Sequence, residues 1–76
     1  MNKDRRKRIL AAIDQLETVQ CDLDNIKSEE EDAYENLPES IQMSDRGDEM
    51  QDAIDTLDNA IGCIEDAVSG LNEIAG

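Results

Sequence analysis

The sequence has almost no aromatic side chains and no histidine. Its 76 residues include one Tyr but no Phe, Trp or His. Aromatic side chains contribute much of the buried surface of small domains, and a chain of this length buries only about 60% of its unfolded surface. We therefore do not expect a lone compact core. The lack of His also removes the commonest general base.

Cysteine, proline and glycine are scarce as well. Two Cys residues are too few for the disulfide framework of a small secreted domain, and without His they cannot complete a tetrahedral zinc site. The apolar run after the basic start, Ile9 to Ile13, is too short for a signal peptide or a membrane span. These absences predict a cytoplasmic protein with reduced thiols, no metal, no cofactor and no enzymatic activity.

Apolar residues in the first half recur at alternating steps of three and four, which is the spacing of a helical seam. The seam positions are Ile9, Ala12, Leu16, Val19, Leu23, Ile26, Glu30, Ala33 and Leu37, with Ile13 and Tyr34 widening the face. The pattern predicts a helix over about 3–35. Pro38 ends it, because the residue before a proline is disfavoured in helical conformation.

The second half repeats in heptads from Met50 to Gly76. A helix over about 45–75 is predicted, with Ser44 or Asp45 as its N-cap. Small residues suit a close approach by another helix, and we assign them to an oligomer interface. These residues are Ala53, Ala60, Gly62, Ala67 and Ser69. The strip that contains Gly62, Cys63, Ser69 and Gly70 is either part of a dimer contact or a groove for a partner's helix.

The connection over 36–44 is too apolar for a solvated linker. Pro38 suits the first turn of a short helical segment, and we expect Ile41 and Met43 to cover the open end of the hairpin. The sequence thus predicts one all-α domain over 1–76, a long antiparallel helical hairpin forming a rod of roughly 45 Å. One hairpin leaves much of its seam wet, so we expect it to dimerise into a four-helix bundle. Cys21 and Cys63 are not expected to align for an intrachain bridge.

Charge is extreme and uneven along the chain. Acidic residues number 20 and basic residues 7, for a net charge of −13, and five of the basic residues lie in 3–8. We expect this basic start to lie beside the end of the second helix, near Glu65, Asp66 and Glu73, where cations suit the helix dipole. Direct nucleic-acid binding is not expected, because the rest of the chain repels phosphate.

The acidic surface is the main functional feature. Residues 9–76 hold 19 acidic and 2 basic side chains, which is roughly one excess charge per 2.6 Å of the expected rod, against about 1.7 Å for duplex DNA. Such a surface attracts proteins with basic sites, although acidity can also serve solubility alone. The predicted partner-binding residues are Glu29, Glu30, Glu31, Asp32, Asp52, Asp55, Asp58, Glu65 and Asp66.

The stretch over 35–67 contains an Asn-Leu-Pro-Glu-Ser turn followed by Ala-Ile heptads. With the basic start and the acidic run containing Tyr34, it resembles small acidic proteins encoded by phages and mobile elements of Firmicutes. The resemblance implies a genomic setting in a bacterial host and assigns no site residues.

Three hypotheses follow for the function. The first is a homodimeric inhibitor of a host nucleic-acid-binding defence protein, of the anti-CRISPR or anti-restriction type, that acts by nucleic-acid mimicry. The alternative is a structural or adaptor coiled-coil bundle in a phage complex. A third, a small-molecule sponge, has only Arg5, Arg6 and Arg8 as candidates for an anionic ligand.

Overall fold

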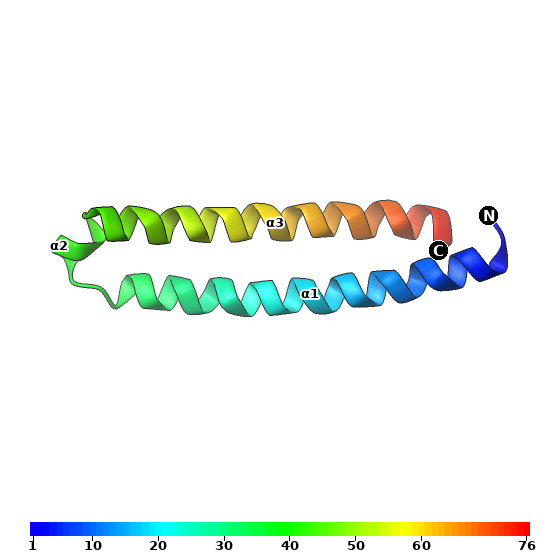
Figure 1. The fold of residues 1–76 in the computed structure, drawn as a ribbon, viewed down its shortest axis with the longest axis horizontal. Helices are drawn as coiled ribbons and strands as arrows, with labels where there is room; N and C mark the ends of the chain where they lie inside the picture. Colours follow the sequence, from blue (N-terminus) through cyan, green and yellow to red (C-terminus); the bar gives the residue numbers. More distant parts are fainter.

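The computed structural model describes all residues from Met1 to Gly76, and it is a helical hairpin. Two long helices, α1 (Lys3–Glu35) and α3 (Asp45–Ala75), run antiparallel, and a single turn of helix, α2 (Glu39–Gln42), lies in the connection. Figure 1 shows the two long helices side by side along the whole of α3. The all-α hairpin with a structured connection is thus confirmed, with the helix bounds that the sequence predicts.

The rod measures 58 × 15 × 12 Å, longer than the 45 Å expected from the sequence. At 1.5 Å per residue, the 33 residues of α1 alone span about 50 Å. Figure 1 shows the start of α1 extending beyond the end of α3, while α2 projects at the other end. The two helices therefore do not overlap over their full length.

Local hydrogen bonds define where the long helices begin. The Asn2 side chain caps α1 by accepting a hydrogen bond from the backbone N–H of Arg5 at 2.8 Å. Ser44 occupies the N-cap position of α3, as predicted, but makes no side-chain cap hydrogen bond. Its hydroxyl instead donates to the carbonyl oxygen of Ile41, which ties the start of α3 to α2.

The open end of the hairpin is closed by different residues from those predicted. Ile41 is 38% exposed and Met43 is 80% exposed, so the expectation that they cover this end is wrong. The Gln42 amide instead donates to the Tyr34 carbonyl oxygen at 3.0 Å. Gly47 is buried against α2, where a Cβ atom would overlap the carbonyl oxygen of Gln42. Only glycine allows this close approach between α2 and α3.

The seam between α1 and α3 is narrower than the apolar pattern of the sequence. On α3 the buried and half-buried seam positions are Gly47, Met50, Ile54, Leu57, Ile61, Ile64, Val68, Leu71 and Ala75. On α1 they are Ile9, Ile13, Leu16, Gln20, Leu23, Lys27, Glu30 and Tyr34, and Leu37 continues the series just after the helix. Both series keep the alternation of three and four residues that characterises two-helix coiled coils.

One predicted column of the α1 seam is wrong. Ala12, Val19, Ile26 and Ala33 are exposed, and their expected places facing α3 are taken by Ile13, Gln20, Lys27 and Tyr34. The column that faces α3 contains the bulkier Ile13 and Tyr34 in place of Ala12 and Ala33, and between them Gln20 and Lys27 reach carboxylates on α3. The apolar face of α1 is wider than α3 can cover, and the covered part includes the two polar residues.

The core of the hairpin is small. The buried hydrophobic residues are Ile13, Ile54, Ile61 and Ala75. No buried side-chain polar atom lacks a hydrogen-bond partner. A chain of this size with so few buried side chains has little hydrophobic stabilisation of its own.

Candidate protein-binding surfaces

Two polar bridges fix the register of α1 against α3. Gln20 Nε2 donates to Glu65 Oε1 at 3.1 Å, and Lys27 Nζ donates to Asp58 Oδ1 at 2.9 Å. The two α1 residues are seven apart, as are their two partners, so residue 20 lies level with 65 and residue 27 lies level with 58. Lys27 Nζ also lies 3.8 Å from Glu31 Oε1 on its own helix.

These bridges define one side of the hairpin. Because Lys27 contacts both Glu31 and Asp58, these carboxylates of α1 and α3 border the same edge of the seam. Residues seven positions apart lie on the same side of a seam helix. We call this side the acidic flank, and its residues are Glu17, Asp24 and Glu31 of α1 with Asp58 and Glu65 of α3.

The carboxylates of the acidic flank alternate between the two helices. On one helix, seven residues correspond to about 10.5 Å. In the register given above, Glu65 falls between the levels of Glu17 and Asp24, and Asp58 falls between those of Asp24 and Glu31. The flank therefore presents a zigzag row with one carboxylate per about 5 Å of rod length.

Lys27 is the one cation within this row. Its side chain is 27% exposed, and its hydrogen bond to Asp58 raises its pKa above the ordinary value, opposed by partial desolvation and assisted by the charges of Asp58, Glu31 and Asp24. A lysine in this state stays protonated at neutral pH. It holds Asp58 and Glu31 in place and neutralises only part of the flank.

The structure distributes the nine predicted acidic residues over several sides of the rod. Glu31, Asp58 and Glu65 belong to the acidic flank. Asp55 lies next to it, because it is three residues before Asp58 on the same helix. The helical spacing places the remaining α3 residues, Asp52 and Asp66, on the outer side of α3, opposite the seam.

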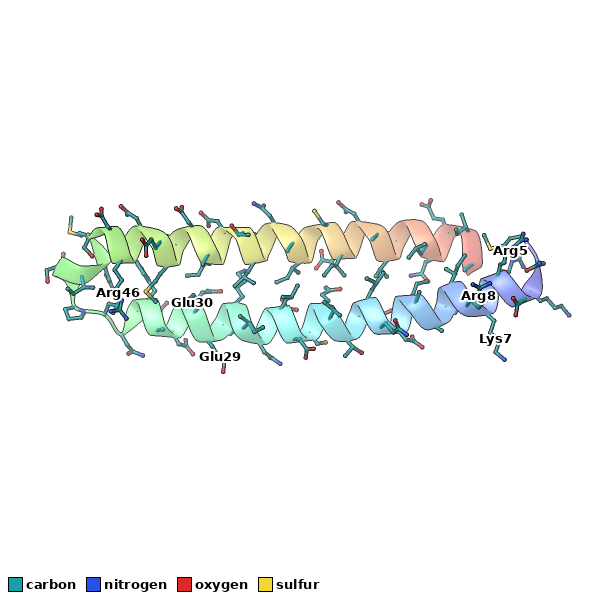
Figure 2. The ribbon with its side chains drawn as sticks, in the orientation of Figure 1. Arg5, Lys7, Arg8, Glu29, Glu30 and Arg46 are labelled. Carbon is teal, nitrogen blue, oxygen red and sulfur yellow. The ribbon has the colours of Figure 1, made fainter.

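On α1 the predicted run separates in the same way. Glu30 is half-buried in the seam, Asp32 lies on the outer side, and Glu29 is exposed. Figure 2 shows Glu29 pointing away from α3 and Glu30 pointing toward it. The sequence reasoning missed Glu17 and Asp24. Their seven-residue spacing from Glu31 is the signal that could have identified them.

The opposite side of the hairpin is apolar. Acidic-flank residues follow a seam residue by four positions, as Glu31 follows Lys27, whereas Ile26 precedes the seam residue Glu30 by four and so lies on the other edge. The same relation on α3 places Ala60 on that other edge, four before Ile64. We call this side the apolar flank. Its residues are Ala12, Val19, Ile26 and Ala33 of α1 with Ala53, Ala60, Ala67 and Ile74 of α3.

The apolar flank lacks acidic residues and is open to solvent. None of the 20 acidic side chains occupies its two columns. Val19 is 46%, Ile26 48% and Ile74 49% exposed. Single exposed apolar residues are ordinary, but a continuous stripe along a rod is typical of an interaction surface.

The predicted oligomer-interface residues divide between the two flanks. Ala53, Ala60 and Ala67 lie on the apolar flank, whereas Gly62 and Ser69 follow Asp58 and Glu65 by four residues and border the acidic flank. A Cβ atom at Gly62 or Gly70 would meet nothing within 4 Å, so neither glycine serves a contact within the hairpin.

The basic start of α1 does not meet α3 as predicted. Extending the register from Gln20 and Glu65 places Gly76 level with Ile9, so residues 3–8 extend beyond the end of α3. The expected proximity to Glu65, Asp66 and Glu73 is therefore wrong. Arg5 and Arg8 instead line an open hollow of about 330 Å³ with Met1, Ile9 and Ala12, and Figure 2 shows Lys7 pointing away from α3.

Few ion pairs restrain this basic end. Arg8 Nη1 lies 3.8 Å from Asp4 Oδ2, and both side chains are 76% exposed, so the pair contributes little. The other charged groups of residues 3–8 form no salt bridge. The free end of the rod is therefore positively charged and its charges are accessible.

Comparison with known protein families, curated proteins and solved structures found no match to this chain. None of the three helices combines the length and the hydropathy that crossing a membrane requires.

Proposed function

We propose that the protein binds a partner through the acidic flank and thereby blocks that partner's nucleic-acid-binding site. The main support for this proposal is the zigzag row of carboxylates on one side of the rod, with Lys27 as its one internal cation. A fixed row of negative charges is what a basic nucleic-acid groove recognises along a phosphate backbone. The resemblance to phage and mobile-element proteins points to cytoplasmic defence proteins of a bacterial host, such as CRISPR effectors and restriction enzymes, as the class of target.

The observed length lowers the charge density below the one that the sequence predicts. A net charge of −13 over 58 Å is one excess charge per about 4.5 Å, whereas duplex DNA has one per about 1.7 Å, or about 3.4 Å along one of its strands. The charge spacing of the hairpin is therefore nearer to that of one strand than to that of the duplex.

A second candidate function is favoured by the apolar flank. An adaptor or structural bundle would use the exposed Val19, Ile26 and Ile74 as its contact surface. The two candidates respond differently to salt. Binding through carboxylates weakens as salt screens the charges, whereas binding through apolar surface is little affected.

The test is capture of proteins from a nuclease-treated bacterial lysate on the immobilised chain at low salt. The bait is compared with a flank variant, Glu17→Gln/Asp24→Asn/Glu65→Gln, and with a matched control, Asp32→Asn/Asp52→Asn/Asp66→Asn, which removes equal charge from the outer sides. We expect nucleic-acid-binding proteins to be captured by the wild type and the control, and their amounts to fall at least about tenfold on the flank variant.

Competition completes the test. A short duplex or single-stranded DNA added to the column should displace the captured proteins, and so should moderate salt. If the same proteins remain bound to the flank variant, or if DNA does not displace them, the mimicry proposal is wrong. Salt-resistant capture that is lost on Ile26→Glu would support the adaptor instead.

A further inference from the structure

We propose that the apolar flank binds a second copy of this chain in antiparallel orientation, forming a four-helix bundle with the two acidic flanks outermost. The proposal concerns the side of the rod that nucleic-acid mimicry leaves unused. It does not depend on that function, since it makes no assumption about what the acidic flank binds.

The apolar flank is matched across the two helices of one hairpin. In the register set by the polar bridges, Ile26 lies level with Ala60 within one residue, and Val19 lies level with Ala67. Ala12 pairs with Ile74 in the same way, and Ala33 with Ala53. Each large side chain thus stands beside a small one, which leaves a stepped surface suited to interdigitation with another helix pair.

The apolar flank alone is smaller than a standard interface. It spans about 32 Å of the rod, from Ala12 to Ala33 at 1.5 Å per residue, and across the 15 Å width of the hairpin this is a face of roughly 480 Å², against about 800 Å² per partner in standard interfaces. The charged ends of the rod must therefore contribute the rest of the contact. Further burial would stabilise the chain, because the hairpin buries only Ile13, Ile54, Ile61 and Ala75 as core residues. Helical bundles of this chain length ordinarily gain their stability from such further apolar burial.

Charge complementarity selects a second copy and its orientation. The free end of the rod carries the basic run Lys3 to Arg8, with Asp4 as its one acid. The loop end carries the acidic residues Glu29, Glu30, Glu31, Asp32, Glu35, Glu39, Asp45, Asp48, Glu49 and Asp52, with Arg46 as its one base. An antiparallel dimer brings each basic end beside an acidic end, whereas a parallel dimer places the two acidic ends together.

The antiparallel arrangement has specific neighbours. A two-fold axis across the middle of the apolar flank packs α3 on α3 of the second copy and α1 on its α1. Arg5 and Arg8, on the apolar side of α1, then lie level with α2 of the second copy, which carries Glu39. Arg46, seven residues before Ala53, lies near the C-terminus of α3 of the second copy, where a cation is favourable.

The two native cysteines lie beside different flanks, so cross-linking through each one can test this arrangement. Both are unpaired and exposed, and they lie within one residue of the same level, close to the middle of the flank. Cys63 precedes Ala67 by four residues and borders the apolar flank, whereas Cys21 follows Glu17 by four and borders the acidic flank. Across the two-fold axis, Cys63 approaches Cys63 of the second copy, and the two Cys21 thiols lie on outer surfaces.

Two single-cysteine variants are treated with a short bismaleimide cross-linker. The protein concentration is one at which sedimentation gives each variant the same mass as the wild-type protein. We expect Cys21→Ser, which retains Cys63, to give a covalent dimer in high yield. Cys63→Ser, which retains Cys21, should give at least about tenfold less. Neither substitution touches the seam, and circular dichroism checks that helix content is unchanged.

Each alternative outcome overturns the proposal. A monomeric mass at millimolar concentration excludes the dimer. A dimeric mass with cross-linking through Cys21 places the interface on the acidic flank. A dimeric mass with no cross-linking through Cys63 excludes the antiparallel packing of α3 on α3, and capture of another protein on this flank in place of a second copy would also contradict it.

Discussion

The two flanks of the hairpin are built from the same two helices in the same register, yet they differ completely in charge. Glu17, Asp24 and Glu31 line one edge of α1, while Val19 and Ile26 line the other. The difference arises from side-chain position around the helix, since residues two apart along the chain, such as Glu17 and Val19, point in nearly opposite directions. Net charge alone therefore says little about this molecule. The lateral distribution of charge assigns one side to carboxylates and leaves the other for apolar contact.

We expect the largest difference between the two flanks when one negative charge is added to each and the dissociation constant of the dimer is measured. Ile26→Glu should raise the dissociation constant of the dimer about 100-fold or more, equivalent to about 2.8 kcal/mol, because the carboxylate has no partner in the apolar interface. Ser28→Glu, two residues away and beside the acidic flank, should change it less than about threefold. Sedimentation equilibrium measures both. Equal effects from the two variants would contradict the assignment of the flanks.

Glycine substitutions separate the closed end of the hairpin from its open surface. Gly47→Ala should lower the free energy of unfolding by about 1–3 kcal/mol, because the new methyl overlaps the Gln42 carbonyl and forces α2 away from α3. Gly62→Ala should raise it by up to about 1 kcal/mol, because alanine is the better helix former and nothing lies in its way. Urea unfolding at a fixed protein concentration gives both values. A tolerated Gly47→Ala would show that the α2 contact is dispensable.

The sequence predicted the helices, their bounds and the sharp stop before Pro38, because periodicity and proline chemistry are local. It could not predict which column of α1 faces α3. Val19 and Ile26 are better core residues than Gln20 and Lys27, yet the column of the latter pair faces α3, since it also contains the bulkier Ile13 and Tyr34. Carboxylates of α3 lie level with Gln20 and Lys27 and bond to them. That choice depends on the register between two distant segments, which no single helix pattern contains.

The register also explains what was missed at the candidate sites. Acidic residues that look continuous in sequence, Glu29 to Asp32, occupy four different directions around α1. Glu17 and Asp24, far from that run, join Glu31 in one row. The basic start was expected beside Glu65 and Glu73, but α3 ends before reaching it.

A smaller effect on dimerisation, at Asp22, tests where the two-fold axis crosses the apolar flank. Asp22 precedes Ile26 by four residues, and in the antiparallel dimer it lies close to Asp22 of the second copy. Asp22→Asn should therefore strengthen dimerisation about two- to fourfold by removing a like-charge contact. Asp24→Asn removes the same charge from the acidic flank and should have less effect. If both variants strengthen the dimer equally, the two-fold axis is misplaced and only net charge matters.

The smallest effect concerns Lys27 and the pH dependence of stability. Its pKa is higher in the folded hairpin than its ordinary value of 10.5, chiefly through the hydrogen bond to Asp58. Its contribution to stability is therefore complete below that value and is lost as the pH rises through the folded pKa. Lys27→Gln should flatten the decline of the urea midpoint above this pH. An unchanged decline would show that the bridge has no energetic role.

The most direct test of the two-sided account is a concentration series of two-dimensional nuclear magnetic resonance spectra of the isotope-labelled chain. We expect dilution to shift the methyl signals of Val19, Ile26, Ala60 and Ala67, which lie on the apolar flank, and to leave the backbone amides of Glu17 and Asp24 nearly unchanged. Shifts concentrated on Glu17, Asp24 and Asp58, or no shifts at any concentration, would contradict it.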